Sequence, residues 1–214
     1  MTTKQLQFST QDIQKNRAIY LERMALYKEF GFDREEAERK IINCLSKDHR
    51  SILEIGTGKG YLTTMLAQPF NRVISVDIDS DEQRIAGLNA AYHEQLNKIE
   101  FVSADACKLE YPDKSFDAVV SAFTFHHLEL PFKVLGEMIR LAANQIVVSD
   151  FNQKGFEAVE KVLKHDGKSH EIKTVYFDIV GVYLKEFNFD VNVFEYEYQI
   201  IYSAVRRQQD KNFG

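Results

Sequence analysis

The chain has 214 residues, of which 44% are hydrophobic and 28% are charged. This length suffices for one α/β domain with a full core, and no apolar run approaches the ~18 residues of a membrane span. The net charge of −5 argues against extensive contact with nucleic-acid phosphates, because such contact needs a basic face. The N-terminus has no apolar signal-peptide core, so we expect a cytoplasmic protein without a membrane partner.

Two helices are predicted in the first 48 residues. Ser9 and Thr10 can cap a helix that runs to about Phe30, where Gly31 and Asp33 interrupt it. A second helix is expected from residue 34 to about residue 45. We interpret residues 1–48 as a helical cap that forms one wall of a substrate pocket.

Strand and helix patterns alternate over residues 49–150. Helices are expected at 61–68, 79–92 and 130–143. Strands are expected at 52–55, 72–77, 99–103, 116–121 and 145–149. Short apolar strands separated by helices predict a parallel sheet that is covered by helices on both faces.

The C-terminal part breaks this alternation. An amphipathic helix is expected at 172–187, and strands at 189–198 and 200–205 follow it. These two strands are too close for a crossover helix, so they must form an antiparallel hairpin. Residues 151–171 are predicted to be a substrate-facing segment with a polar lid loop. With the final helix and hairpin at 172–205, residues 1–214 make a single domain, and no pattern in them sets an oligomeric state.

Residues 53–60, Leu-Glu-Ile-Gly-Thr-Gly-Lys-Gly, join the first strand to a helix through a turn with three glycines. Positions without a Cβ let a ligand touch the backbone. A phosphate-binding P-loop has Lys after its last glycine, whereas Lys59 precedes Gly60. A dinucleotide turn has its third glycine where Tyr61 stands, and this side chain would obstruct helix–strand packing. The turn therefore favours a ligand that has no phosphate but has a cationic amino-acid end.

With Glu54 two residues before the first glycine, this turn resembles motif I of the class I S-adenosylmethionine-dependent methyltransferases. The parallel sheet closed by a hairpin is also similar to that family, over roughly residues 35–205. The resemblance implies a Rossmann-like three-layer α/β sandwich with a seven-stranded, mostly parallel sheet, a C-terminal antiparallel hairpin and added N-terminal helices. Residues 140–145 lack the Pro-Gly-Gly turn of many relatives, so the subfamily stays open.

The resemblance also implies a set of cofactor contacts. The turn would wrap the methionine part of S-adenosylmethionine, and Glu54 would help to hold its ammonium group. Asp77 can accept hydrogen bonds from both ribose hydroxyls, although it could instead cap the next helix, as we expect for Asp79. Ile78 would lie against the adenine, and Asp105 would accept from its amino group. The full predicted set is Glu54, Gly56, Thr57, Gly58, Gly60, Tyr61, Asp77, Ile78, Asp105, Ala106 and Ser121.

His126 and His127 follow the fourth strand, in a segment that is similar to one in many small-molecule methyltransferases. One interpretation is hydrogen-bonded scaffolding. The other is a catalytic base, which histidine suits because it titrates near neutral pH. A metal site with His165 and His170 is a third alternative, but the spacing matches no standard motif, so no metal is predicted.

The predicted function is transfer of a methyl group from S-adenosylmethionine to a small-molecule acceptor, which leaves S-adenosylhomocysteine. Two alternatives remain: an NAD(P)-dependent oxidoreductase and a non-catalytic S-adenosylmethionine-binding protein of the same fold. Nucleic acid is not expected as a substrate. The Asn/Asp-Pro-Pro-Tyr/Phe motif of amino-methylating nucleic-acid enzymes is absent at residues 123–126, Phe-Thr-Phe-His.

Overall fold

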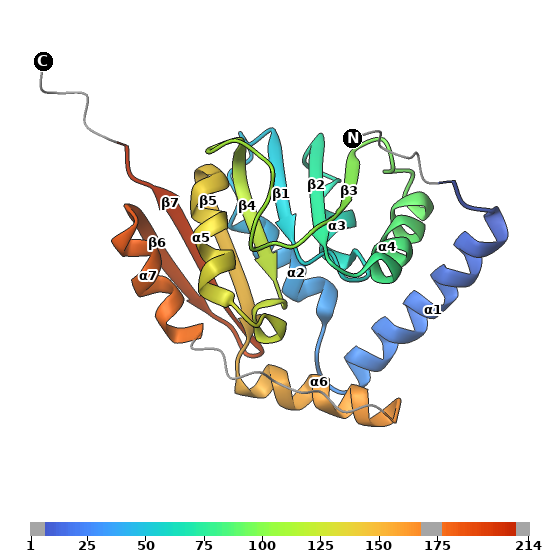
Figure 1. The fold of residues 1–214 in the computed structure, drawn as a ribbon. Coiled ribbons are helices and arrows are strands. Elements are labelled where there is room, and N and C mark those ends of the chain that lie inside the picture. The colour runs from blue at the N-terminus through green and yellow to red at the C-terminus, as the bar shows by residue number, and fades with distance from the viewer. Residues whose placement is uncertain (1–6, 168–176, 209–214) are drawn as a thin grey trace, which may run out of the picture.

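The computed structural model describes residues 7–167 and 177–208. Within them a seven-stranded sheet has the order β3-β2-β1-β4-β5-β7-β6 (Figure 1). The strands are β1 (Ser51–Ile55), β2 (Arg72–Asp77), β3 (Ile99–Ser103), β4 (Phe116–Ala122), β5 (Ala142–Phe151), β6 (Phe189–Glu195) and β7 (Gln199–Arg206). The seven-stranded sheet predicted from the sequence is confirmed.

The sheet is parallel from β3 through β5, and β7 is antiparallel to both of its neighbours, β5 and β6. The chain runs outward from β1 to β2 and β3, and then crosses back to place β4 on the other side of β1. This reversal between β1 and β4 is a topological switch point, where ligands of such sheets bind at the carboxyl ends of the strands.

Helices cover both faces of the sheet and complete three layers (Figure 1). One buried cluster joins the sheet to α2 (Arg34–Asn43), α3 (Tyr61–Leu66), α4 (Ser80–Tyr92) and α6 (Gln153–His165). The other joins it to α5 (Pro131–Leu141) and α7 (Val180–Glu186). Because side chains of a strand alternate between faces, Ile52 enters the first cluster and Leu53 the second.

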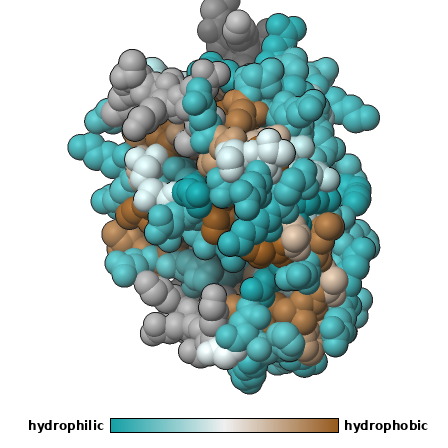
Figure 2. All heavy atoms as spheres, turned by 90° about the vertical axis from the view of Figure 1, so that its right-hand side faces the viewer, coloured by the Kyte–Doolittle hydropathy of each residue, from teal (hydrophilic) through white to brown (hydrophobic). Residues whose placement is uncertain are grey.

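The N-terminal helix α1 (Thr10–Glu29) lies outside the sandwich, against α4 and toward α6 (Figure 1). Asn16 Nδ2 of α1 donates to Asn89 Oδ1 of α4 at 2.7 Å. Met24 is the buried residue of α1. This side of the molecule shows mostly hydrophilic residues with smaller hydrophobic patches (Figure 2). None of the described helices is both long and apolar enough to cross a membrane.

Side-chain caps begin the helices where the sequence predicts them. Ser9 accepts a hydrogen bond from Asp12 N, and Asp33 accepts one from Glu36 N. Asp79 accepts from the amides of both Asp81 and Glu82. These bonds satisfy amides that have no partner within their own helix.

The loop predicted after β5 is wrong for residues 153–165, because these residues form α6, and residues 168–171 lie outside the described part of the chain. Asn152 caps α6 by accepting from Gly155 N at 3.0 Å, and Val159 and Val162 bury its inner face. Gly155 does not break the helix. Its missing Cβ instead allows close packing, since a Cβ there would lie 2.1 Å from the carbonyl oxygen of Tyr198.

The helix predicted at 172–187 is only partly observed. A 3₁₀ turn, Phe177–Ile179, precedes the short helix α7, and residues 172–176 lie outside the described part of the chain. A second 3₁₀ turn, Phe125–His127, follows β4.

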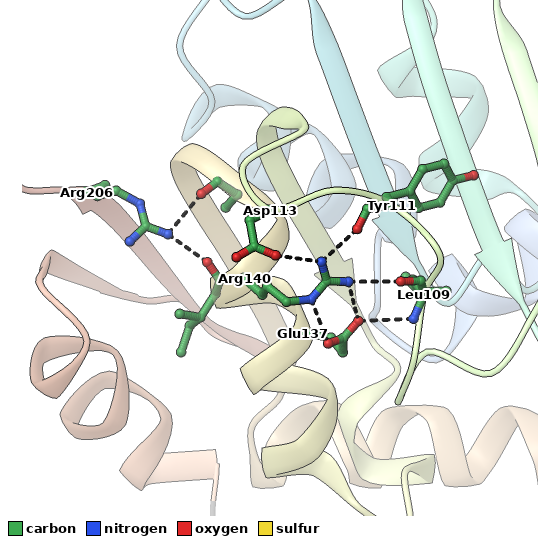
Figure 3. Close-up of polar contacts among 8 residues, drawn as sticks. Leu109, Tyr111, Asp113, Glu137, Arg140 and Arg206 are labelled. Atoms are coloured by element: carbon green, nitrogen blue, oxygen red, sulfur yellow. Dashed lines mark hydrogen bonds and ion pairs between the residues drawn. The ribbon is translucent and has the colours of Figure 1, made fainter.

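Arg140 of α5 fastens the connection between β3 and β4 (Figure 3). Its Nη2 donates to Leu109 O at 2.9 Å, and its Nη1 donates to Tyr111 O at 2.6 Å and to Asp113 Oδ1 at 2.9 Å. Glu137 binds the same guanidinium and also accepts from Leu109 N. This network holds the loop that contains Asp105, a predicted cofactor residue.

Candidate cofactor and active site

A cavity of about 920 Å³ opens at the carboxyl ends of β1, β2 and β4 and beside the loop after β3. It lies at the switch point of the sheet and is at the upper end of the range for small-molecule sites. Helices α1, α2 and α6 contribute Arg23, Tyr27, Arg34 and Leu163 to its wall, and Asp166, which follows α6, adds to it.

The three glycines of the turn have three different surroundings, although all have a φ in the left-handed region, between +48° and +88°. A Cβ on Gly56 would lie 2.1 Å from Thr124 Oγ1, and one on Gly60 would lie 2.6 Å from Ala86 Cβ. A Cβ on Gly58 would meet nothing within 4 Å. Gly56 and Gly60 therefore permit packing inside the protein, whereas Gly58 opens its backbone to the cavity.

Glu54 is a buried acid at the end of β1. It accepts hydrogen bonds from Thr63 Oγ1 at 2.5 Å and from Ser75 Oγ at 2.6 Å. Burial, with a smaller contribution from the nearby carboxylates of Glu38 and Asp77, raises the pKa of Glu54 to about 8, although these two hydrogen bonds lower it. Since Glu54 also lines the cavity, a cationic group bound there would favour its ionised form.

Asp77 ends β2 and has two local hydrogen bonds. Its Oδ2 accepts from Gly58 N at 2.7 Å, and its Oδ1 accepts from Asp79 N at 3.0 Å. It therefore braces the glycine turn while it lines the cavity, and Asp79 caps α4 as predicted. Ile78 follows with 77% of its surface exposed, which is unusual for a large aliphatic side chain and suits a site where a ligand ring covers it.

Asp105 and Ala106 line the cavity from the loop after β3. Cys107 N donates to Asp105 Oδ1 at 2.8 Å, and this bond holds the pKa of Asp105 below its usual value. The carboxylate is thus ionised at neutral pH, and a carboxylate can accept further hydrogen bonds besides this one.

Two predicted cofactor residues lie behind the cavity wall. Ser121 is fully buried, and its hydroxyl donates to the carbonyl of Ile55 at 2.9 Å, which joins β4 to β1. Gly60 is buried at the start of α3 and packs against α4. Nine predicted residues do line the cavity: Glu54, Gly56, Thr57, Gly58, Tyr61, Asp77, Ile78, Asp105 and Ala106.

The two predicted catalytic histidines differ in their surroundings. His126 is buried, with Nδ1 2.7 Å from Asp150 Oδ1, and its backbone amide donates to Asp150 Oδ2. His127 is exposed and lines the cavity, with its ring centroid 4.0 Å from that of His126. The scaffolding interpretation therefore fits His126, while His127 has access to a ligand. Among the described residues, no three His, Cys, Asp or Glu side chains are placed to hold a metal ion, and His170 lies outside them.

Sequence reasoning missed the charged residues of the cavity wall. Arg34 and Glu38 form a buried pair on α2, and Arg23 of α1 pairs with Asp166 beyond α6. Nothing in the local sequence distinguishes these residues from a solvated helix face. Phe123 was also missed: it lines the cavity with φ of +52°, a conformation that is costly for a bulky residue and that clusters at functional sites.

Comparison with known proteins defines the class. Residues 53–148 match a family model described as a methyltransferase domain. This match covers 96 of the 214 residues, and together with the sheet order and the cavity described above it indicates a class I S-adenosylmethionine-dependent methyltransferase domain, for which S-adenosylmethionine is the cofactor.

Individual relatives match only part of the chain. It is 34% identical over 126 residues to a demethylmenaquinone methyltransferase from Thermus thermophilus, which is 57% of this chain and 56% of that protein. It is also 34% identical over 94 residues, 42% of this chain and 30% of that protein, to a probable ribosomal RNA small subunit methyltransferase A from Methanosarcina barkeri. The chain thus spans about half or less of the length of these relatives.

The fold matches over nearly the whole chain. A solved structure of a SAM-dependent methyltransferase from Aquifex aeolicus superimposes with a TM-score of 0.60 at 21% identity, over 93% of this chain and 99% of that one. This likeness shows the fold, which includes the helices before β1 and the terminal hairpin.

Proposed function

We propose that this chain transfers a methyl group from S-adenosylmethionine to a small-molecule acceptor. One observation carries the proposal: Glu54, Asp77 and Asp105 lie at or just after the carboxyl ends of three successive parallel strands and line the same cavity. Their order matches the ammonium, ribose and adenine of an extended cofactor. Gly58 offers open backbone beside the methionine part, and exposed Ile78 offers an apolar surface for the adenine.

S-adenosylmethionine would supply the methyl group from its sulfonium. The acceptor would attack this methyl in line with the bond to sulfur, and S-adenosylhomocysteine would be the leaving group. Such a step depends mainly on alignment and on exclusion of water. The residues of this chain would bind and orient both reactants. The cap at 1–48 and the substrate-facing segment at 151–171 would enclose the acceptor, a role supported by the cavity wall that α1, α2 and α6 provide.

His127 lines the cavity and is of a type suited to proton transfer. If the acceptor loses a proton when it is methylated, His127 is the candidate base because it lines the cavity. The negative net charge and the quinone-methylating relative support a small molecule over an RNA. The ribosomal RNA relative keeps RNA as the competing acceptor class.

Isothermal titration with S-adenosylmethionine and S-adenosylhomocysteine tests the cofactor site. We expect both to bind, and failure of either to bind at millimolar concentration would overturn the proposal. Thermal shifts with NAD(H) and with S-adenosylmethionine distinguish an oxidoreductase from a methyltransferase, because each class should be stabilised by its own cofactor. Formation of S-adenosylhomocysteine with a panel of small-molecule acceptors and with ribosomal RNA then separates an enzyme from a non-catalytic binding protein, and a small molecule from RNA.

A further inference from the structure

Arg34, the first residue of α2, places its guanidinium in the cavity wall among three aromatic rings. Its central carbon lies 4.9 Å from the ring centroid of Tyr61, 5.2 Å from that of Phe123 and 5.7 Å from that of Tyr27. Only 19% of its side chain is exposed. These rings come from α3, from the segment after β4 and from α1, so the guanidinium is fixed where the cap meets the cofactor turn.

The terminal nitrogens of Arg34 carry N–H donors that have no acceptor among the described residues. A guanidinium has five N–H donors, and Nε of Arg34 uses one of them on Glu38 Oε1 at 2.9 Å. Within residues 7–167 and 177–208, no hydrogen bond is recorded from Nη1 or Nη2. Arg34 lines the cavity, and a planar pair of donors without protein acceptors is suited to a carboxylate, which it can bind through two parallel hydrogen bonds.

Arg34 belongs to the same charge cluster as Glu54. Glu38 and Glu54 are each 1% exposed, and the carboxylate of Glu38 is close enough to raise the pKa of Glu54. Arg34 hydrogen-bonds to Glu38, and Arg34 and Glu54 both line the cavity, so this cation and this acid can reach the same bound ligand. An α-amino acid group, with an ammonium and a carboxylate on one carbon, complements Glu54 and Arg34 at once.

We propose that Arg34 binds the carboxylate of the amino-acid end of S-adenosylmethionine through its terminal nitrogens, while Glu54 holds the ammonium. This assignment rests on the cofactor site proposed above. Two other cations line the cavity. Arg23 is already paired with Asp166, and Lys59 is a half-exposed, flexible side chain of the turn itself. Arg34 differs from both because the three aromatic rings and Glu38 hold its guanidinium group in one orientation before a ligand binds.

Titration calorimetry with a matched pair of ligands tests this assignment without turnover. Decarboxylated S-adenosylmethionine lacks only the carboxylate. We expect the protein to bind S-adenosylmethionine on the order of 10- to 100-fold more tightly than its decarboxylated form, as charge-assisted hydrogen bonds imply. Arg34→Lys should lose most of this preference. The double variant Arg34→Met/Glu38→Gln, which leaves no buried unpaired charge, should lose it entirely while still binding both ligands.

Matched variants separate the outcomes. Arg23→Met makes the same change at another cationic position of the cavity and should keep the preference. An unchanged preference in Arg34→Lys and in the double variant, or no preference in the unaltered protein, would overturn the proposal. A loss seen only in Lys59→Met would assign the carboxylate to Lys59 and overturn it equally. If the unaltered protein binds neither ligand, the proposed cofactor site itself fails. Thermal unfolding checks that each variant is folded. If the double variant does not fold, Arg34→Lys tests the proposal in its place, because it keeps a positive charge opposite Glu38.

Discussion

Asp77 and Asp79 are two residues apart in the sequence but have different structural roles. Asp77 lines the cavity and holds Gly58 N, whereas Asp79 caps α4. Asp77→Ala should weaken S-adenosylhomocysteine binding on the order of 100-fold, because hydrogen bonds to a charged group typically contribute about 1.5–3 kcal/mol each. Titration calorimetry measures this loss.

Asp79→Ala is the matched control. It should lower the free energy of unfolding by about 1 kcal/mol through loss of the cap and leave affinity within a few-fold. Equal affinity losses in the two variants would show that Asp77 acts only by shaping the start of α4, and would remove its predicted contact with the ribose.

Glu54 predicts a pH dependence with a definite sign. Its pKa of about 8 in the folded protein lies above the usual value of 4.5. The stabilisation that its protonated form provides is complete below about pH 4.5 and is lost as the pH rises through about 8. The ligand-free protein should therefore become less stable over this window, as chemical denaturation at several pH values would measure. Glu38, whose pKa burial raises to about 7, contributes in the same direction.

The same group should make cofactor affinity depend on pH in the opposite sense. An ammonium bound at Glu54 favours the ionised carboxylate, so binding releases a proton below pH 8. Affinity for S-adenosylhomocysteine should then rise between pH 6 and 8, by up to about tenfold per unit. Glu54→Gln keeps acceptors for Thr63 and Ser75 but cannot titrate, so its affinity should not change with pH in this range. A parallel rise in both proteins would assign the proton to another group.

At the scale of elements, the loop from β3 to β4 depends on Arg140. Arg140→Met removes donors to the carbonyls of Leu109 and Tyr111 and a partner of Glu137 (Figure 3). We expect a loss of about 1–3 kcal/mol in the free energy of unfolding. Because the loop contains Asp105, affinity for S-adenosylhomocysteine should fall as well.

Arg207→Met is the control for this change. Arg207 pairs with exposed Asp190, and such pairs contribute about 0–1 kcal/mol. Denaturant unfolding of both variants measures the contrast. A cost for Arg140→Met no larger than that for Arg207→Met would mean that the backbone holds the loop without this network.

Elements were predictable where local signals agreed with the tertiary structure. Ser9, Asp33 and Asp79 cap helices at the positions that their side-chain chemistry predicts, and β2 and β3 begin and end at the predicted residues. The helix α6 was missed because Gly155 and the polar residues around it look like a loop. Only the packing of Gly155 against the backbone of Tyr198 explains that glycine.

At the scale of the whole molecule, the grouping of residues at the carboxyl ends of neighbouring strands was easier to predict than the packing of helices against the sheet. Glu54, Asp77 and Asp105 could be aligned because the carboxyl ends of parallel strands meet at one edge of a sheet. Arg34 could not be predicted, since its place depends on how α2 packs beside the turn and the segment after β4. The exclusion of Ser121 from the cavity likewise depends on its bond to the neighbouring strand.

The cavity draws its wall from the cap, the core and α6, so binding should stabilise all of them together. If residues 1–214 form one domain, thermal unfolding should be a single transition, with coincident loss of helix signal and of tyrosine environment, since the chain has ten tyrosines and no tryptophan. S-adenosylhomocysteine at 100 times its dissociation constant should add about 2.7 kcal/mol. For a chain of this size that is a rise of roughly 5–11 °C in Tm. Circular dichroism and calorimetry would measure both. Two transitions, of which the ligand moves only one, would instead mean that the cap unfolds separately from the core and does not enclose the cofactor.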